Sequence, residues 1–297
     1  MIRFLFITDT HIGADSMEFH QQPAYAKKVK QLLFHLREQI ENCSIDFIIH
    51  GGDLVHTCKP QFIREAYNLF KFSVPTYLCL GNHDLDDPNA LNIWLNYASE
   101  LFISDSPNYE IVTDTCVIHV YPNHWESERA FYWGEIQEPF LSEEQIKQLE
   151  ANLQKNMDKV HLLVTHSPIF GMSTEQSKLS QVIHEPPASF RNSITKLTQK
   201  YPHLKVVLSG HNHLNTLKVS DDCVYMTGSS FIETPFEYKL VEVDKSHIKI
   251  STCRINPSEL DFVAEYNHER QYVQGREQDR ELVMDLEMRQ QITRGGL

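Results

Sequence analysis

The stretch "RFLFITDTH" (Arg3–His11) sets a short apolar run directly before an aspartate and a histidine. An apolar run of this length, bounded by polar residues, is typical of a buried β-strand. The strand would therefore present Asp9 and His11 just beyond its end. Four later apolar runs end in side chains of the same kinds, and this repeated arrangement decides the fold that we expect.

The N-terminal half alternates strand and helix patterns. Apolar runs at 45–50 and 75–80 predict two more buried strands. Apolar residues at three- and four-residue spacing within 26–40 predict a helix, and residues 59–72 predict a second one. A strand-helix-strand-helix-strand order implies right-handed crossovers and a parallel sheet.

The second half adds strands of both kinds. Residues 109–121 predict a hairpin, and the runs at 160–165 and 204–209 predict two more buried strands. Between them, Ser142 followed three residues later by Gln145 is a capping-box pattern that predicts a helix start. After the last buried strand the chain becomes a series of short antiparallel strands. We expect one domain over residues 1–262 and a charged, partly helical C-terminal extension over 263–297, which is a candidate surface for oligomerisation.

Composition excludes several classes of protein. A chain of 297 residues, 41% hydrophobic and 23% charged, can bury a large core. Six scattered cysteines form no C-x-x-C pair, which argues against a zinc ribbon or disulfide framework and fits a reducing compartment, so we expect a cytoplasmic protein. No apolar run is long enough for a membrane helix. The net charge of −13 argues against binding a nucleic-acid polymer.

The five buried strands all end in carboxylate, amide or imidazole side chains. In open α/β sheets ligands bind beyond the carboxyl ends of the strands, so these groups should meet at one edge. Each residue taken alone has an ordinary structural explanation, such as a turn acid or a core histidine, but five strands ending in this way favour a shared site. The residues are Asp9 and His11, Asp53, Asn82 and His83, His166, and His211 with His213.

This set of donors fits a pair of divalent ions. Without His83 it holds two carboxylates, one amide oxygen and four imidazoles, which is too many for a single tetrahedral zinc. Mixed nitrogen and oxygen ligands without cysteine point to Mn, Fe or Zn. Two such ions, about 3.5–4 Å apart, can hold a phosphoryl group and generate a hydroxide at neutral pH. One carboxylate must bridge them, and Asp53, alone on its loop, is the natural choice.

The motifs "DTH", "GGD", "GNHD", "TH" and "GHNH" occur in this order between about Ile2 and Thr216. In kind and order they resemble the calcineurin-like metallophosphoesterases. The resemblance implies an α/β fold, a four-layer α/β/β/α sandwich of two mixed β-sheets flanked by helices, with the metal site at the carboxyl ends of the strands.

The resemblance also implies a role for each residue. His83 would not bind metal but would act on the substrate as general acid or as a donor to the phosphate. In the protein serine/threonine phosphatases an acid stands where this chain has His56, which argues against that branch and leaves the partner that orients His83 open. One ion would be held by Asp9, His11, Asp53 and His213, and the other by Asp53, Asn82, His166 and His211.

The substrate is predicted less directly. The first three motifs are similar to those of double-strand-break repair nucleases, whereas "LSEEQIKQLEANL", "LLVTHSPIFG" and "VVLSGHNH" look more like small phosphodiesterases, including bacterial cyclic-nucleotide enzymes. We expect hydrolysis of a small phosphodiester, such as a nucleotide or cyclic nucleotide, by a metal-bound hydroxide. A repair-type nuclease and a non-catalytic scaffold remain alternatives. The aromatic segment 121–134 could stack on substrate or cover the sheet edge, and His184 and Arg191 in the long connection 170–192 could reach phosphate.

Overall fold

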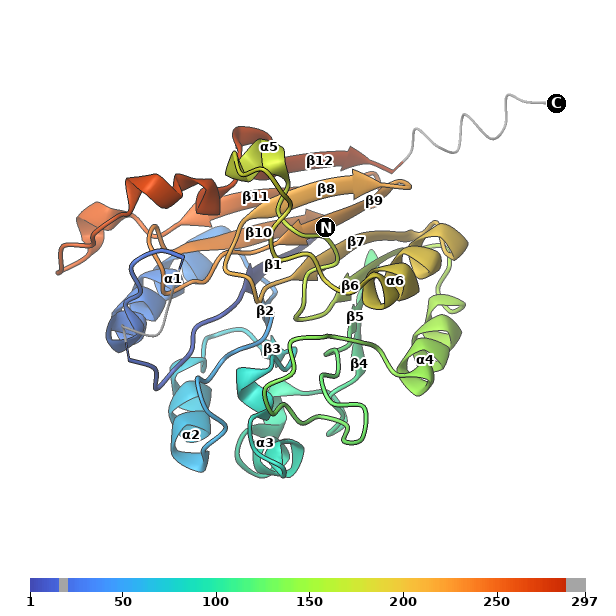
Figure 1. Ribbon diagram of the computed structural model, residues 1–297, viewed down its shortest axis with the longest axis horizontal. Coiled ribbons are helices and arrows are strands. Elements are labelled where there is room, and N and C mark those ends of the chain that lie inside the picture. Colours follow the sequence, from blue (N-terminus) through green and yellow to red (C-terminus); the bar gives the residue numbers. More distant parts are fainter. Residues whose placement is uncertain (16–20, 287–297) are drawn as a thin grey trace.

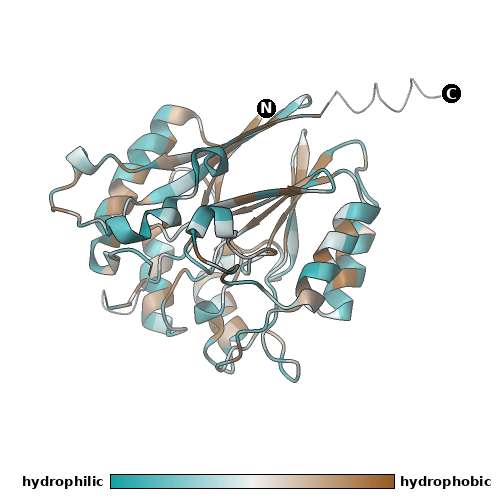
Figure 2. Ribbon diagram, turned by 45° about the horizontal axis from the view of Figure 1, so that its top comes forward, coloured by the Kyte–Doolittle hydropathy of each residue, from teal (hydrophilic) through white to brown (hydrophobic). Residues whose placement is uncertain are grey.

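The computed structural model describes residues 1–15 and 21–286. Two six-stranded sheets pack against each other, and helices cover their outer faces (Figure 1). This is the four-layer α/β/β/α sandwich that the motifs imply. The strands of the two inner layers are mainly apolar, while the helices are apolar on one side and polar on the other (Figure 2).

The first sheet has the strand order β12-β11-β10-β1-β2-β3. Its β1, β2 and β3 are parallel, with Phe4 opposite Phe47 and Ile48 opposite Thr76, as the alternation of strands and helices predicts. The other three strands are antiparallel. The strands are β1 (Ile2–Ile7), β2 (Phe47–His50), β3 (Thr76–Leu78), β10 (Glu237–Val243), β11 (His247–Arg254) and β12 (Glu281–Asp285).

The second sheet has the order β4-β5-β6-β7-β9-β8. Its central strands β5, β6, β7 and β9 are parallel, and the antiparallel partners β4 and β8 form the two edges. The predicted hairpin and both predicted buried strands are confirmed. The strands are β4 (Tyr109–Val112), β5 (Cys116–Val120), β6 (Val160–Val164), β7 (Leu204–Ser209), β8 (Thr216–Ser220) and β9 (Cys223–Thr227).

Helices bury their apolar sides against the sheets. Leu149 of α4 and Ile194 of α6 belong to a cluster with Leu163 and Val207, on the outer face of the second sheet. The α4 helix begins with the predicted capping box, in which Ser142 Oγ accepts from the backbone N–H of Gln145. The helices are α1 (Val29–Cys43), α2 (Pro60–Leu69), α3 (Ala90–Ala98), α4 (Glu143–Leu153), α5 (Thr174–Ser177) and α6 (Ala188–Lys200).

The C-terminal extension takes part in the first sheet. Its described residues form two 3₁₀-helices and then β12, which pairs with β11. The domain boundary at residue 262 stays a prediction, and the last eleven residues of the extension, 287–297, lie outside the described residues. None of the helices in the described ranges is both long and apolar enough to cross a bilayer. The 3₁₀-helices are η1 (Ala26–Lys28), η2 (His83–Leu85), η3 (Ser99–Leu101), η4 (Pro257–Glu259), η5 (His268–Gln274) and η6 (Glu277–Asp279).

Candidate metal centre

All eight predicted site residues meet where β1, β2, β3, β6 and β7 end. Six of them line a cavity of about 310 Å³, and the other two, Asp9 and His166, are fully buried beside these. The parallel strands thus bring together residues that are more than 200 positions apart in the chain, such as His11 and His213. The cavity-lining members are His11, Asp53, Asn82, His83, His211 and His213.

Asp9, His11 and His213 form the first of two ligand clusters. Their ligand atoms all lie within 4.8 Å of one another. The Nε2 atoms of His11 and His213 are 3.2 Å apart, and His213 Nε2 is 3.5 Å from Asp9 Oδ1. Two ring nitrogens and a carboxylate oxygen that surround one point have the chemistry and spacing of a divalent metal site.

The second cluster contains Asp53, Asn82, His166 and His211. His166 Nε2 lies 3.2 Å from Asn82 Oδ1 and 3.3 Å from Asp53 Oδ2. His211 Nδ1 lies 3.0 Å from the same Asn82 oxygen. The amide oxygen therefore completes a mixed nitrogen and oxygen donor set, as a hard or borderline divalent ion requires.

Asp53 lies between the two clusters. Its Oδ2 is 3.7 Å from His11 Nε2 on one side and 3.3 Å from His166 Nε2 on the other. Its Oδ1 instead accepts the backbone N–H of His83, at 2.9 Å. One carboxylate oxygen thus lies close to both clusters, as a bridging ligand would. That Asp53 bridges two ions stays a prediction.

Hydrogen bonds behind the rings fix the histidine orientations. His166 Nδ1 lies 2.9 Å from the carbonyl oxygen of Gly51, so Nδ1 carries a proton and Nε2 is the nitrogen that faces the other ligands. His213 Nδ1 lies 2.5 Å from Glu233 Oε1, which has the same effect. Glu233 was not anticipated from the sequence, because no motif marks it and the contact spans 20 residues.

The backbone of the site is held in an uncommon conformation. Five of the seven predicted ligands have a positive φ, a region that non-glycine residues rarely occupy and that costs about 1–3 kcal/mol each. Such residues gather at functional sites because the surrounding fold enforces them. They are Asp9 (φ 56°), His11 (φ 41°), Asp53 (φ 54°), His211 (φ 70°) and His213 (φ 58°).

Glycines allow the loops to approach these side chains. A Cβ atom at Gly81 would collide with Asp53 Oδ1 and lie 2.8 Å from His166 Cε1. A Cβ at Gly210 would collide with Thr8 Oγ1 and lie 2.5 Å from Asp9 Oδ2. The glycines before Asn82 and His211 are therefore required by close packing.

The electrostatics of the buried cluster suit a bound cation. Burial raises the pKa of Asp53, but the neighbouring His166 and His83 pull it well below its usual range, so the carboxylate is ionised. Burial, with His166 nearby, lowers the pKa of His211 to about 3 and keeps that ring neutral. The pKa of His213 is raised well above its usual value, because Glu233 and Asp9 outweigh the effect of burial. A metal ion would take the place of that proton, since a coordinating imidazole must be neutral.

His83 lies beside the clusters and has a defined orientation. Its Nδ1 is 2.9 Å from the backbone carbonyl oxygen of His56, and the two rings stack with centroids 4.6 Å apart. The main-chain carbonyl of His56 thus fixes the orientation of the His83 ring, for which the sequence left the partner open. With Nδ1 committed to the carbonyl, Nε2 is the nitrogen that His83 can offer to a substrate.

The aromatic segment places two tryptophans against histidines of the site, and stacking on a substrate stays a prediction. Trp125 is 2% exposed and packs against the His211 ring at 5.1 Å, so it supports a predicted ligand. Trp133 is half-buried, and its ring centroid lies 5.1 Å from that of His83. His184 lines the cavity, whereas Arg191 lines a different hollow and pairs with Glu185.

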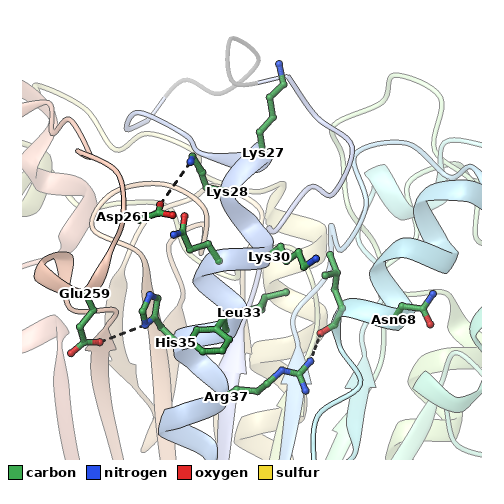
Figure 3. Close-up of a pocket in the computed structure, with 12 residues that line it drawn as sticks. Lys27, Lys28, Lys30, Leu33, His35, Arg37, Asn68, Glu259 and Asp261 are labelled. Carbon is green, nitrogen blue, oxygen red and sulfur yellow. Dashed lines mark hydrogen bonds and ion pairs between the residues drawn. The ribbon is translucent and has the colours of Figure 1, made fainter.

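A larger hollow of about 790 Å³ lies on α1 and contains none of the predicted site residues (Figure 3). Two ion pairs lie in it: Lys28 with Asp261, at 3.9 Å, and His35 with Glu259, at 3.7 Å. Cavity size alone therefore does not locate the chemistry in this molecule, and the convergence of ligand atoms does.

Comparison with known proteins identifies the family. The family described as calcineurin-like phosphoesterase matches residues 2–215, and the chain belongs to it. It is therefore a hydrolase that acts on phosphoester bonds, and the predicted family and fold are confirmed.

Individual relatives are distant. The chain is 26% identical over 213 residues to a "Probable cyclic nucleotide phosphodiesterase" of Ruthia magnifica subsp. Calyptogena magnifica, covering 71% of this chain and 77% of that one. It is 23% identical over 229 residues to a "Probable glycerophosphodiester phosphodiesterase GpdQ" of Arcobacter nitrofigilis, covering 75% and 76%. The solved structure of a dimetal phosphatase from Danio rerio has the same fold, with a TM-score of 0.63 at 15% identity over 86% of this chain and 96% of that one.

Proposed function

We propose that this phosphoesterase hydrolyses a small phosphodiester at a centre of two divalent ions. The observation that carries the proposal is Asp53 Oδ2, which lies between two separate ligand clusters at the base of the cavity. Asp9, His11, Asp53 and His213 would hold one ion, and Asp53, Asn82, His166 and His211 the other, with Mn, Fe or Zn as the metals that suit these donors.

We assign different steps of the reaction to the two ions and to His83. Two bound ions supply an activated water at neutral pH and stabilise the charge that develops on the phosphate. His83, fixed through Nδ1 by the His56 carbonyl, would use Nε2 to protonate the leaving oxygen or to donate to the phosphate. Trp133 beside it would limit the access of water to this ring.

The cavity lining favours a diester over a monoester. Monoesters carry nearly two negative charges at neutral pH and diesters one, so a monoester site gains more from cationic side chains. Among the residues that the structure describes, the lining contains no lysine or arginine and offers imidazoles and amides instead, including Gln21, Gln137 and Asn212. The names of the two relatives, both phosphodiesterases, point in the same direction.

The two alternatives have less support. A repair-type nuclease must approach a polyanion, which a net charge of −13 opposes. A non-catalytic scaffold would not need two ligand clusters or an oriented His83. This chain has a residue of the expected type at all eight predicted site positions.

Activity on two chromogenic esters tests the proposal. We expect a higher kcat/KM for bis(p-nitrophenyl) phosphate than for p-nitrophenyl phosphate with at least one of Mn, Fe and Zn, and none without metal. The Asp53→Asn variant, prepared in parallel, controls for contaminating phosphatases. A preference for the monoester with every metal would show that the diester proposal is wrong.

Location and assembly also stay proposals. All six cysteines are free thiols and four are buried, which supports a reducing compartment such as the cytoplasm. The C-terminal extension supplies β12 as the outermost strand of the first sheet, so pairing of two copies along that strand is the route to oligomerisation that we propose.

A further inference from the structure

The ring of His213 is held from behind by a buried carboxylate. Glu233 is 1% exposed, and its Oε1 lies 2.5 Å from His213 Nδ1, while Nε2 of that ring faces Asp9 and His11. A histidine that donates its second N–H to a carboxylate has a fixed tautomer and ring orientation and is a stronger metal ligand.

Glu233 is itself fixed by Gln22. Its second oxygen, Oε2, accepts the backbone N–H of Gln22 at 2.8 Å. The Gln22 side chain is 3% exposed and makes three hydrogen bonds to the main chain of the C-terminal extension. Its Nε2 donates to the carbonyls of Asn267 and Arg270, both at 3.0 Å, and its Oε1 accepts from the N–H of Asn267 at 2.9 Å.

The extension also contacts the "GHNH" loop directly. The backbone N–H of Asn215 donates to the carbonyl of Val273 at 2.8 Å, and Gln176 Nε2 donates to the carbonyls of both Asn215 and Tyr272. Asn215 is fully buried, and its Nδ2 donates to Glu237 Oε2 at 2.5 Å. The described extension thus contacts the chain just after His213, and it contacts Gln22, whose backbone N–H binds the carboxylate behind that ring.

We propose that Glu233 is a positioning residue for the ion of the Asp9, His11 and His213 cluster, and that residues 267–273 of the extension hold it in place through Gln22. This inference rests on the proposed two-ion centre. It assigns the extension, which lies beyond the residues matched by the family, a part in completing one of the two sites and leaves the other to Asn82, His166 and His211.

Metal affinities of three variants test the proposal. Glu233→Gln keeps the size of the side chain and removes its charge, and we expect one ion to bind about 10- to 100-fold more weakly and the other as in wild type. Gln22→Met keeps the backbone N–H that donates to Glu233 and loses the three side-chain hydrogen bonds. The affinity for the same ion should therefore fall by less than in Glu233→Gln. Glu242→Gln is the matched control, because that carboxylate, on β10, pairs with Arg3 near the start of β1, away from the strand end that leads to Asp9. Calorimetric titration with Mn²⁺ gives both affinities, and electron paramagnetic resonance separates a single ion from a coupled pair.

Each possible result supports or contradicts either the two-ion centre or the role of Glu233. If wild type binds fewer than two ions, the two-ion centre fails. If wild type binds two and Glu233→Gln binds both equally well, or loses both in parallel, Glu233 does not position one site and the inference is wrong. If Glu233→Gln does not fold, Gln22→Met decides by the same criteria. Combining Glu233→Gln with Asn82→Ala should abolish tight binding of both ions, which identifies the affected site.

Discussion

Asp53 is the residue at which the two-ion arrangement can be tested most directly. Its Oδ2 reaches both clusters, whereas Asn82 Oδ1 lies beside His166 and His211 of one cluster. Asp53→Asn should therefore lower the occupancy of both sites, and Asn82→Ala that of one. Elemental analysis after dialysis against buffered metal measures this. Two ions retained by Asp53→Asn would contradict the bridging role.

His83→Ala should leave the metals bound and slow turnover. The ring is not among the proposed ligands, although one of its nitrogens lies within 4.8 Å of ligand atoms of His11 and His56. We expect its loss to remove a proton donor and no ligand, which typically costs about 10²- to 10³-fold in rate. Esters with good leaving groups need little protonation and should lose less than alkyl esters. A His247→Ala control, at an exposed histidine outside the cavity, should behave as wild type.

Metal content decides how that result is read. If His83→Ala loses metal as readily as His166→Ala, His83 is a ligand. An unchanged rate for every ester would make it a bystander.

The ligands that directly follow the strands could be predicted from the sequence. The groups that fix the orientation of those side chains could not. Asp9, Asp53 and His166 follow apolar runs directly, so their convergence could be inferred from strand order alone. Glu233 reaches His213 only through the tertiary fold, and its segment contains no pattern that sets it apart. The His56 carbonyl that orients His83 could not be anticipated either, because every residue has a carbonyl.

At the level of single elements, the start of α4 offers a clean stability test. Ser142 Oγ accepts from the N–H of Gln145, and Gln145 Oε1 accepts from the N–H of Ser142. Ser142→Ala should lower the free energy of unfolding by about 0.5–2 kcal/mol, because one backbone donor loses its partner. Activity should not change, since α4 covers the outer face of the second sheet.

Lys147→Ala in the same helix is the control for that test. Lys147 is largely exposed and pairs with Glu143 at the surface, so its loss should change stability by no more than about 0.5 kcal/mol. Urea unfolding of both variants measures the difference. Equal effects would mean that the cap contributes nothing beyond ordinary surface substitution.

Elements with strong local patterns were predicted to within a few residues, and those that depend on a distant partner were not. β1, β6 and β7 are mainly apolar and largely buried. β12 has the sequence "ELVMD", in which exposed and half-buried residues alternate, and it forms by pairing with β11. Three apolar residues between two acids are too short a run to predict a strand in this charged segment, so the sheet edge that it joins could not be inferred locally.

For the whole molecule, metal removal should lower thermal stability. The two clusters bury Asp9 and Asp53 at no more than 2% exposure in a chain with a net charge of −13, so divalent cations bound there neutralise buried negative charge. An ion that binds only the folded state stabilises it by RT ln(1 + [L]/Kd), about 2.7 kcal/mol at a concentration of 100 Kd. Chelator-treated protein should melt several degrees lower than protein with excess Mn²⁺, and added metal should restore the melting temperature.

The Asp53→Asn variant separates site binding from general effects of salt. It should melt at nearly the same temperature with and without chelator, because it no longer holds either ion tightly. Calorimetry of both proteins at matched ionic strength gives the comparison. An unchanged melting temperature of the wild type, with complete metal removal verified by elemental analysis, would mean that the ligand clusters do not bind ions tightly enough to stabilise the fold.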